Sequence, residues 1–164
     1  DVERSRGLGD VYKRQIEYLN VDILGMKGKS RVITVPADIQ KLWNDVRVIL
    51  RNPVIARYEL KEDIQLGKKA GITALCEYSL LSDNEYPTYA ITKKEITESG
   101  IRKMKQVHSG EEIGCVVLEL GYFIDFKNKK LEDPLSVTLS LTESEKQDER
   151  IGISIKRMLE EYVW

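Results

Sequence analysis

Apolar residues recur with two different spacings along the chain, which predicts a mixture of strands and helices. Residues 21–35 contain two short extended stretches joined by Lys27-Gly28-Lys29. Because glycine readily takes the positive φ of a tight turn, this pattern predicts a β-hairpin with a basic tip. Asp38 then stands where it can cap a helix, whose apolar face would comprise Ile39, Leu42, Trp43, Val46, Ile49 and Leu50. Pro53 is expected to end this helix, because proline disfavours helical backbone in the residue before it.

The rest of the chain alternates between the two patterns. Alternation over Val54–Leu60 predicts a half-buried strand, and helical spacing predicts a helix over residues 70–81. Further extended segments are expected over residues 87–91, 101–107 and 113–126, with Val116, Leu118 and Leu120 on one face of the last. These elements predict an α+β fold, in which a small mixed or antiparallel sheet packs with three to four helices.

Helix ends in this part are marked by residues that bind free backbone groups. Residues 92–95 have the spacing Thr-x-x-Glu of a reciprocal cap, and Gly100 is placed to close the short helix that follows. Asp133-Pro134 predicts another helix start, because Asp accepts from free amides and Pro fits the first turn. Residues 142–145 repeat the reciprocal cap before a last amphipathic helix that ends at Trp164.

Residues 10–15, Asp-Val-Tyr-Lys-Arg-Gln, do not resemble a selected sequence. Back-translated as GAT-GTG-TAT-AAG-AGA-CAG, they resemble the transposase end sequence used to prepare sequencing libraries, and residues 5–9 match the adaptor arm beside it. We therefore expect residues 1–15 to be adaptor-derived and exclude them from fold reasoning. On this interpretation the native sequence begins near Ile16 and is the C-terminal part of a longer protein.

Composition narrows the class of protein. Of the 164 residues, 41% are apolar, enough for one modest core. No apolar run approaches the roughly twenty residues that cross a bilayer, so we expect a soluble, cytoplasmic protein. With one His, and with Cys76 and Cys115 far apart, the chain lacks the ligands of a soft-donor zinc site. Both thiols are expected to be buried and reduced.

The net charge of −1 conceals an asymmetry. Residues 16–61 contain eight Lys or Arg against five Asp or Glu, a balance of +3, whereas residues 62–164 carry −5. An acidic body repels a phosphate backbone, so any contact with nucleic acid is expected on the front part. Lys27, Lys29 and Arg31 are the candidate contacts, because flexible cations neutralise phosphate charge. A solvated hairpin with lysines at its tip is the alternative.

Other kinds of chemistry have weaker sequence signals. Residues 25–28, Gly-Met-Lys-Gly, lack the spacing and the Lys-Ser/Thr of a phosphate-binding loop. His108 precedes Ser-Gly and is expected to be an exposed turn residue rather than a base beside a nucleophile. The best set for a catalytic Mg²⁺ is Glu119 and Asp125 with Lys127, although acids at such positions are more often solvated edges and helix caps.

The chain also contains seven short strings in a recognisable order, namely Arg51-Asn-Pro-Val54, Ala70-Gly-Ile-Thr-Ala-Leu75, Tyr78-Ser-Leu-Leu-Ser-Asp83, Pro87-Thr-Tyr-Ala90, Asp133-Pro-Leu-Ser136, Leu139-Ser-Leu141 and Tyr162-Val-Trp164. Together they resemble a bacterial family of MarR-like winged-helix transcriptional regulators. The second and fifth strings also resemble, more faintly, the C-terminal domain of abortive-infection antitoxins of the type IV class. In both groups a winged helix comes first and an α/β domain follows.

The resemblance implies that residues 23–35 are the wing and that Lys27, Lys29 and Arg31 contact the DNA backbone. It divides the chain into an adaptor-derived segment (1–15), a remnant of the winged-helix DNA-binding domain (16–36), and a C-terminal α/β regulatory or interaction domain (37–164). The recognition helix that reads base edges would be missing. This chain alone is therefore expected to bind DNA poorly and without sequence preference.

The expectation is a non-catalytic regulator that needs no cofactor and no metal. Its partner would be DNA, through the winged-helix part, with no membrane contact. A homodimer and a protein partner on the acidic domain remain open. Two alternative functions remain as well: an antitoxin module whose acidic surface masks a toxin, and a metal-dependent nuclease or nucleotidyl-transfer domain that uses Glu119, Asp125 and Lys127.

Overall fold

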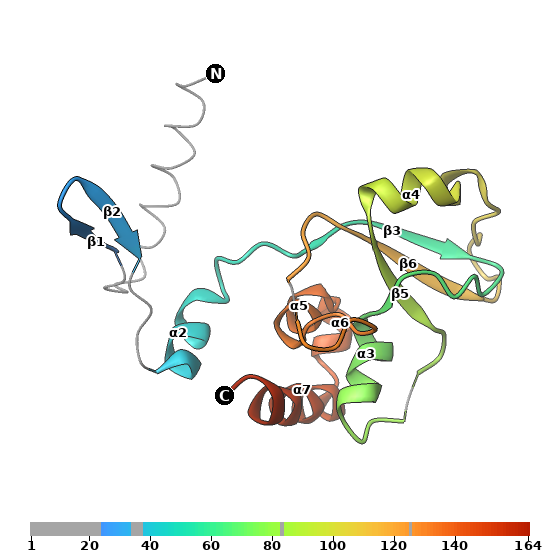
Figure 1. The fold of residues 1–164 in the computed structure, drawn as a ribbon. Helices are drawn as coiled ribbons and strands as arrows, with labels where there is room; N and C mark the ends of the chain where they lie inside the picture. Colours follow the sequence, from blue (N-terminus) through green and yellow to red (C-terminus); the bar gives the residue numbers. More distant parts are fainter. Residues whose placement is uncertain (1–23, 34–37, 83, 125) are drawn as a thin grey trace. The chain divides into compact units, whose positions relative to one another are not determined.

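The computed structural model describes residues 24–33, 38–82, 84–124 and 126–164 (Figure 1). The chain divides into two compact units, residues 1–51 and 52–164. This division falls after Arg51, later along the chain than the boundary expected between residues 36 and 37. The segment interpreted as adaptor, residues 1–15, lies outside the described residues.

The first unit contains a two-stranded hairpin. Strands β1 (Leu24–Lys27) and β2 (Ser30–Ile33) pair antiparallel, which confirms the hairpin expected from the sequence. Each strand has four residues, and the two are joined by the shortest turn that a hairpin commonly uses.

Helix α2 (Ile39–Val46) follows in the same unit. It begins at Asp38, whose side chain accepts a hydrogen bond from the backbone amide of Lys41 at 2.8 Å, as the sequence predicted. The predicted end near Pro53 is wrong, because the amides of Ile49 and Leu50 both bind the carbonyl of Val46 in a turn that closes the helix early.

A four-stranded mixed sheet forms the centre of the second unit. Its strands lie in the order β3 (Val54–Leu60), β6 (Cys115–Leu120), β5 (Thr88–Thr92) and β4 (Lys68–Lys69). Strand β6 is antiparallel to β3 and parallel to β5, and β4 is antiparallel to β5. All six residues of β6 are buried, because helices cover both faces of the sheet.

One face of the sheet is covered by α4 (Lys93–Ser99) and the 3₁₀ helix η1 (Ile101–Lys103) (Figure 1). The predicted reciprocal cap is present at Thr92 and Glu95, and Gly100 ends α4 with a φ of +71°. Ile96 and Ile101 are fully buried in a cluster with residues of β3, β5 and β6. These two helices also connect the parallel strands β5 and β6, which need such a crossover.

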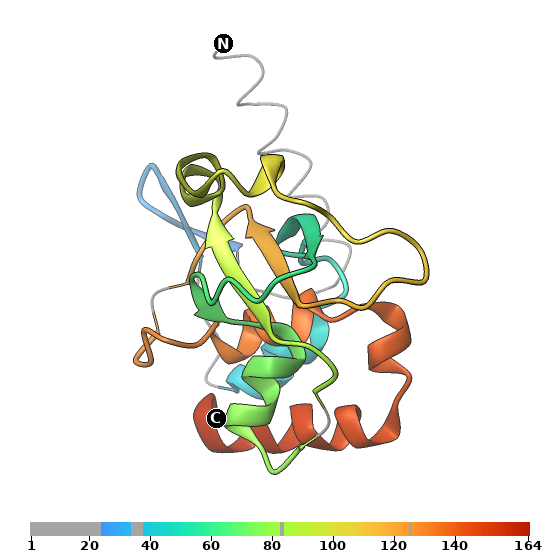
Figure 2. The ribbon, with the colours of Figure 1, turned by 90° about the vertical axis from the view of Figure 1, so that its right-hand side faces the viewer.

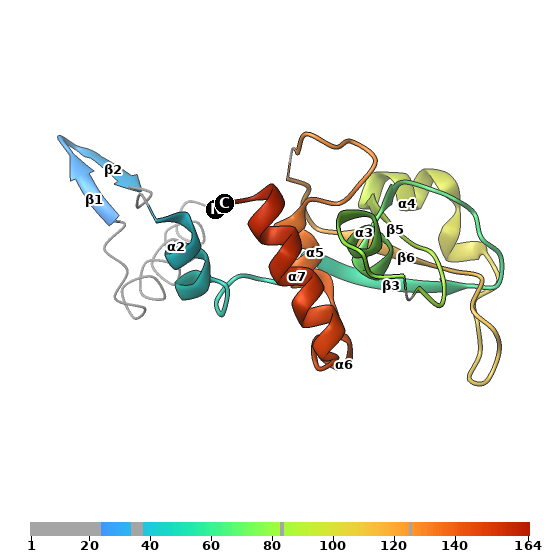
Figure 3. The same ribbon diagram turned by 90° about the horizontal axis from the view of Figure 1, so that it is seen from below.

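The opposite face is covered by α3 (Gly71–Tyr78), on which α5 (Pro134–Ser140) and α7 (Glu149–Tyr162) pack. The short helix α6 (Glu143–Lys146) leads into α7. Figure 2 shows α7 beneath α3, and Figure 3, seen from below, shows α7 in front and α4 on the far side of the sheet. The predicted shared face of β6 lies on the α3 side, where its apolar residues pack with Ala70 and Ala90.

The expected α+β class with a small mixed sheet is therefore confirmed. The structure describes six α-helices, where three to four were expected, partly because the last predicted helix is divided. Helices α6 and α7 each have their own N-cap, at Thr142 and Asp148. None of the described helices is long and apolar enough to cross a membrane.

Two segments of the body differ from expectation. Residues 101–107 are not extended over their length, because Gly100 redirects the chain and Ile101 is used to cover the core from a 3₁₀ turn. Only Gln106 forms a bridge, to Leu60. Strand β4 was not predicted, since two residues are too few to produce a periodic pattern.

Candidate nucleic-acid interface

The turn of the hairpin presents a basic residue to solvent. Lys27 pairs with Ser30, so Gly28 and Lys29 form a two-residue turn. Gly28 has a φ of +64° and Lys29 does not have a positive φ, which fits a type II′ turn with glycine at its first central position. The Lys29 side chain is exposed. The predicted basic tip is therefore present.

The three candidate cations occupy different parts of this hairpin. Arg31 lies opposite Met26, one rung away from the pair formed by Lys27 and Ser30. Lys27 and Arg31 thus lie at neighbouring positions of the ladder, and Lys29 lies in the turn that joins the two strands. Of these three side chains, only that of Lys29 lies within the described part of the structure.

Charge is divided unevenly between the two units. In the first unit, with the segment interpreted as adaptor left out, residues 16–51 contain six Lys or Arg against four Asp or Glu, a balance of +2. Residues 52–164 contain sixteen against twenty, a balance of −4. The hairpin therefore belongs to the unit that a phosphate backbone attracts.

The residues considered for metal catalysis are not brought together in the described structure. The side chain of Glu119 is only 5% exposed, and Asp125 lies outside the described residues. Lys127 lines a hollow beside Phe126 and Tyr162. The described residues contain no group of three or more His, Cys, Asp or Glu side chains arranged to hold a metal ion.

Glu119 is instead held by two neighbours on the α4 side of the sheet. Its Oε2 accepts a hydrogen bond from the hydroxyl of Tyr58 at 3.0 Å and from Nη2 of Arg102 at 3.4 Å. Nε of Arg102 also donates to the Tyr58 hydroxyl, at 3.3 Å. The hydrogen bond with Tyr58 raises the pKa of Arg102 most, and Glu119 raises it further. Both therefore favour the charged guanidinium. A carboxylate already paired with a guanidinium is a poor ligand for a further cation.

A second buried carboxylate, Glu132, stabilises a helix end. Its Oε2 accepts from the amide of Gly71 at 3.1 Å and from the hydroxyl of Ser140 at 3.4 Å. The N-cap residue of α3 is Ala70, which has no side-chain oxygen, so a residue distant in sequence supplies the cap. Burial, the largest effect, raises the pKa of Glu132 to about 7.

Two adjoining hollows, of about 330 and 680 Å³, lie between the C-terminal turns of α3 and α7. They share Glu77, Tyr78, Glu161 and Tyr162 as lining residues. The rings of Tyr78 and Tyr162 lie edge to face, 5.0 Å apart. Leu80 is 88% exposed beside them. We refer to this region as the α3–α7 groove.

Other expectations about single residues have mixed outcomes. His108 is exposed in a turn, as predicted. Cys115 is buried and burial raises its thiol pKa, but Cys76 is only half-buried; neither forms a disulfide. The segment expected to be extended over residues 113–126 ends as a strand at Leu120, and Tyr122 beyond it is 42% exposed.

Sequence reasoning missed the roles of Tyr58, Arg102 and Glu132. The pairs that they form join residues far apart in the chain, and no local spacing encodes such contacts. One signal was available: residues 93–105 contain five Lys or Arg against two Glu, within a body that is acidic. The expectation that any contact with nucleic acid falls on the front part of the chain did not consider this segment.

Comparison with known proteins adds no relative. No protein-family model matches the chain, and neither the curated proteins nor the solved structures include a significant match.

Proposed function

We propose that this chain is the C-terminal regulatory or interaction part of a winged-helix DNA-binding transcription regulator, without a catalytic role. In this proposal β1 and β2 are the wing, and the body of residues 52–164 mediates dimerisation, partner binding or a response to a signal. The ordered strings of residues that resemble MarR-like regulators support the assignment.

The observation that carries the proposal is the hairpin itself. It is a short antiparallel ribbon with a type II′ glycine turn, an exposed Lys29 at the tip, and a place in the unit of positive charge balance. Lys27 and Arg31 lie in the two strands, close to this turn. A narrow ribbon with three cations in and beside its turn suits a groove of the duplex, where a phosphate strand runs along each side.

The test is a mobility-shift assay on the promoter fragment of the protein's own gene, with any preceding winged-helix segment restored. Changing Lys27, Lys29 and Arg31 together to Ala should weaken binding about 10- to 100-fold and reduce the slope of log K against log salt by about 2–3, because about three phosphate contacts are lost. A matched control removes the same charge from α6 and α7, by changing Lys146, Lys156 and Arg157 to Ala.

Absence of a shift at low salt would contradict the proposal. An equal loss in the hairpin and control variants would contradict the role of the hairpin, since it would reflect net charge alone.

The antitoxin module remains a second candidate, favoured by the α3–α7 groove. Tyr162 and Leu80 are exposed large apolar residues there, and Glu77 and Glu161 give the groove an acidic rim. An apolar surface with charged residues around it is typical of protein–protein contact. Co-purification with a toxin encoded beside the gene, lost in Leu80→Asp but retained in the exposed control Val48→Asp, would support it. Retention in both variants would count against the groove.

A further inference from the structure

A compact group of basic residues lies on the body, on the outer side of the layer formed by α4 and η1. Residues 93–105 contain five Lys or Arg and two Glu, whereas the rest of the body contains eleven against eighteen acids. Ile96 and Ile101 anchor the layer in the core. The charged residues of the segment are therefore left on its solvent side, where they are exposed.

The two acids of this segment are already engaged. Glu95 accepts from the amide and the hydroxyl of Thr92, both at 2.7 Å, in the cap of α4. Glu98 lies 3.7 Å from Lys94. In contrast, the side chains of Lys93, Lys103 and Lys105 form no ion pair with the residues that the structure describes.

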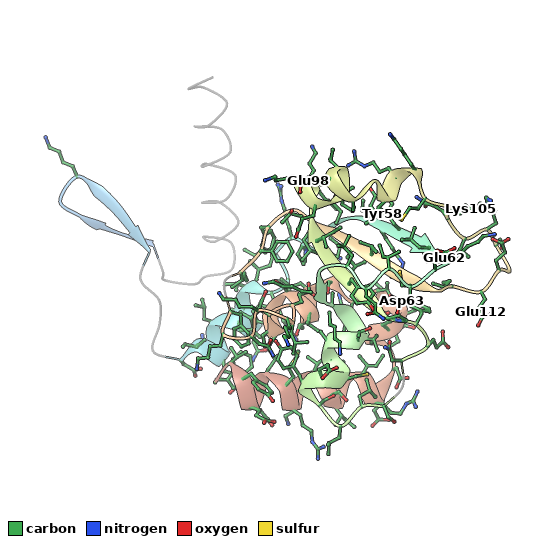
Figure 4. All side chains as sticks on the ribbon, turned by 45° about the vertical axis from the view of Figure 1, so that its right-hand side comes forward. Tyr58, Glu62, Asp63, Glu98, Lys105 and Glu112 are labelled. Carbon is green, nitrogen blue, oxygen red and sulfur yellow. The ribbon has the colours of Figure 1, made fainter. Side chains whose placement is uncertain are left out.

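Arg102 is the best-positioned cation of the group. Tyr58 and Glu119 hold its Nε and Nη2 from the sheet side, while half of the side chain (51%) stays exposed. A guanidinium has five N–H groups, of which these contacts use two. The remaining donors form a fork already held in place, the geometry that binds phosphate oxygens bidentately. Figure 4 shows Tyr58 on the sheet beneath α4, with Glu98 and Lys105 at the outer surface.

We propose that the α4–η1 surface of the body binds the phosphate backbone of a nucleic acid, with Arg102 as the oriented contact and Lys93, Lys103 and Lys105 as flanking charges. The surface belongs to the second unit and the hairpin to the first, so the surface is an additional contact and not a part of the wing. The choice of nucleic acid rests in part on the proposed function.

The composition of the surface favours a nucleic acid over an acidic protein. The one large apolar side chain exposed in residues 93–105 is Met104, at 38%. Specific protein interfaces have an apolar or aromatic centre made of several residues. One exposed methionine does not form such a centre. Phosphate contacts, by comparison, require only positioned charges and donors.

The experiment measures binding of the full chain to a fluorescein-labelled 20-base-pair duplex by anisotropy, at several salt concentrations. Simultaneous change of Lys93, Lys103 and Lys105 to Ala should weaken binding at low salt about tenfold or more and lower the salt slope by about 2–3. The control is the α6–α7 triple variant (Lys146, Lys156 and Arg157 to Ala), which removes equal charge and should leave the slope unchanged.

A second variant tests the orientation of Arg102 without a change of charge. Arg102→Lys keeps the cation but loses the fork held by Tyr58 and Glu119. We expect it to weaken binding about 3- to 10-fold at a temperature where circular dichroism shows that the variant is still fully folded. A wild-type affinity in this variant would contradict the role of Arg102.

The outcomes separate this proposal from the function proposed for the hairpin. The proposal is overturned if the variant with Lys93, Lys103 and Lys105 changed to Ala binds the duplex as the wild type does, while the hairpin variant loses binding. That result would leave the proposed role of the wing intact. Loss of binding in the variant of Lys93, Lys103 and Lys105 alone supports the proposal and counts against the wing. Competition by polyglutamate as effective as competition by the duplex would overturn the assignment to nucleic acid and point to an acidic protein.

Discussion

At the scale of single residues, Glu132 shows how one buried carboxylate can link folding to pH. It caps α3 from a position 61 residues away, and its side chain is almost completely buried. Burial raises its pKa from 4.5 to about 7. Between these two values the folded protein binds more protons at this site than the unfolded chain does. The contribution of Glu132 to the free energy of unfolding therefore falls as pH rises from 4.5 to 7, and is constant above and below that range.

We predict that Glu132→Gln removes this pH dependence. The amide oxygen retains the hydrogen bond from Gly71, but no charge has to be buried at high pH. Relative to wild type, the variant should gain up to about 3 kcal/mol between pH 4.5 and 8. Urea unfolding of both proteins at pH 5 and pH 8 measures the difference. An identical pH dependence in the two proteins would show that Glu132 is not the titrating group.

At the scale of elements, the loop between β3 and β4 lies close against the neighbouring strand. Gly67 has a φ of +88°, and a Cβ atom there would stand 2.5 Å from the carbonyl oxygen of Ala90 in β5. Gly110, in the turn after η1, has the same φ of +88° with open space around it. The two glycines thus differ in packing and share one backbone conformation.

We predict that Gly67→Ala destabilises the fold by about 2–4 kcal/mol, the sum of backbone strain and overlap with β5. Gly110→Ala should cost only the strain, about 1 kcal/mol. Thermal unfolding of both variants provides the comparison. Equal losses would mean that the loop moves away from β5 without penalty.

At the scale of the whole molecule, the two units differ in net charge, and both apolar clusters of the sheet belong to the second unit. The two apolar clusters on the faces of the sheet consist of residues between Val54 and Phe123, within the second unit. A single sheet with both faces covered has the components that a domain needs to fold.

We predict that the fragment 52–164 unfolds in one cooperative thermal transition, because it keeps the residues of both clusters. Far-ultraviolet circular dichroism, which follows the helices and strands, and near-ultraviolet circular dichroism, which follows aromatic packing, should change at the same temperature. Non-coincident transitions, or a fragment that binds hydrophobic dyes at room temperature, would show that residues 1–51 are needed for its packing.

The features that could be predicted from the sequence are those formed within one helical turn or one strand. The caps at Asp38, Thr92 and Asp133, the end of α4 at Gly100, and the bounds of β3 all follow from residues within a few positions of each other. Their hydrogen bonds form locally, so composition and spacing are sufficient to predict them.

Only the tertiary structure decided the rest. Strand β4 exists because Lys68 and Lys69 lie beside β5, and Glu132 caps α3 because the fold carries it there. The group of Tyr58, Arg102 and Glu119 likewise joins β3, η1 and β6. These contacts link residues distant in sequence, where the partner of each polar group depends on the arrangement of the whole sheet. By itself the sequence determined the fold class and the basic hairpin; the packing of the sheet determined which groups hold the buried carboxylates of Glu119 and Glu132 in place.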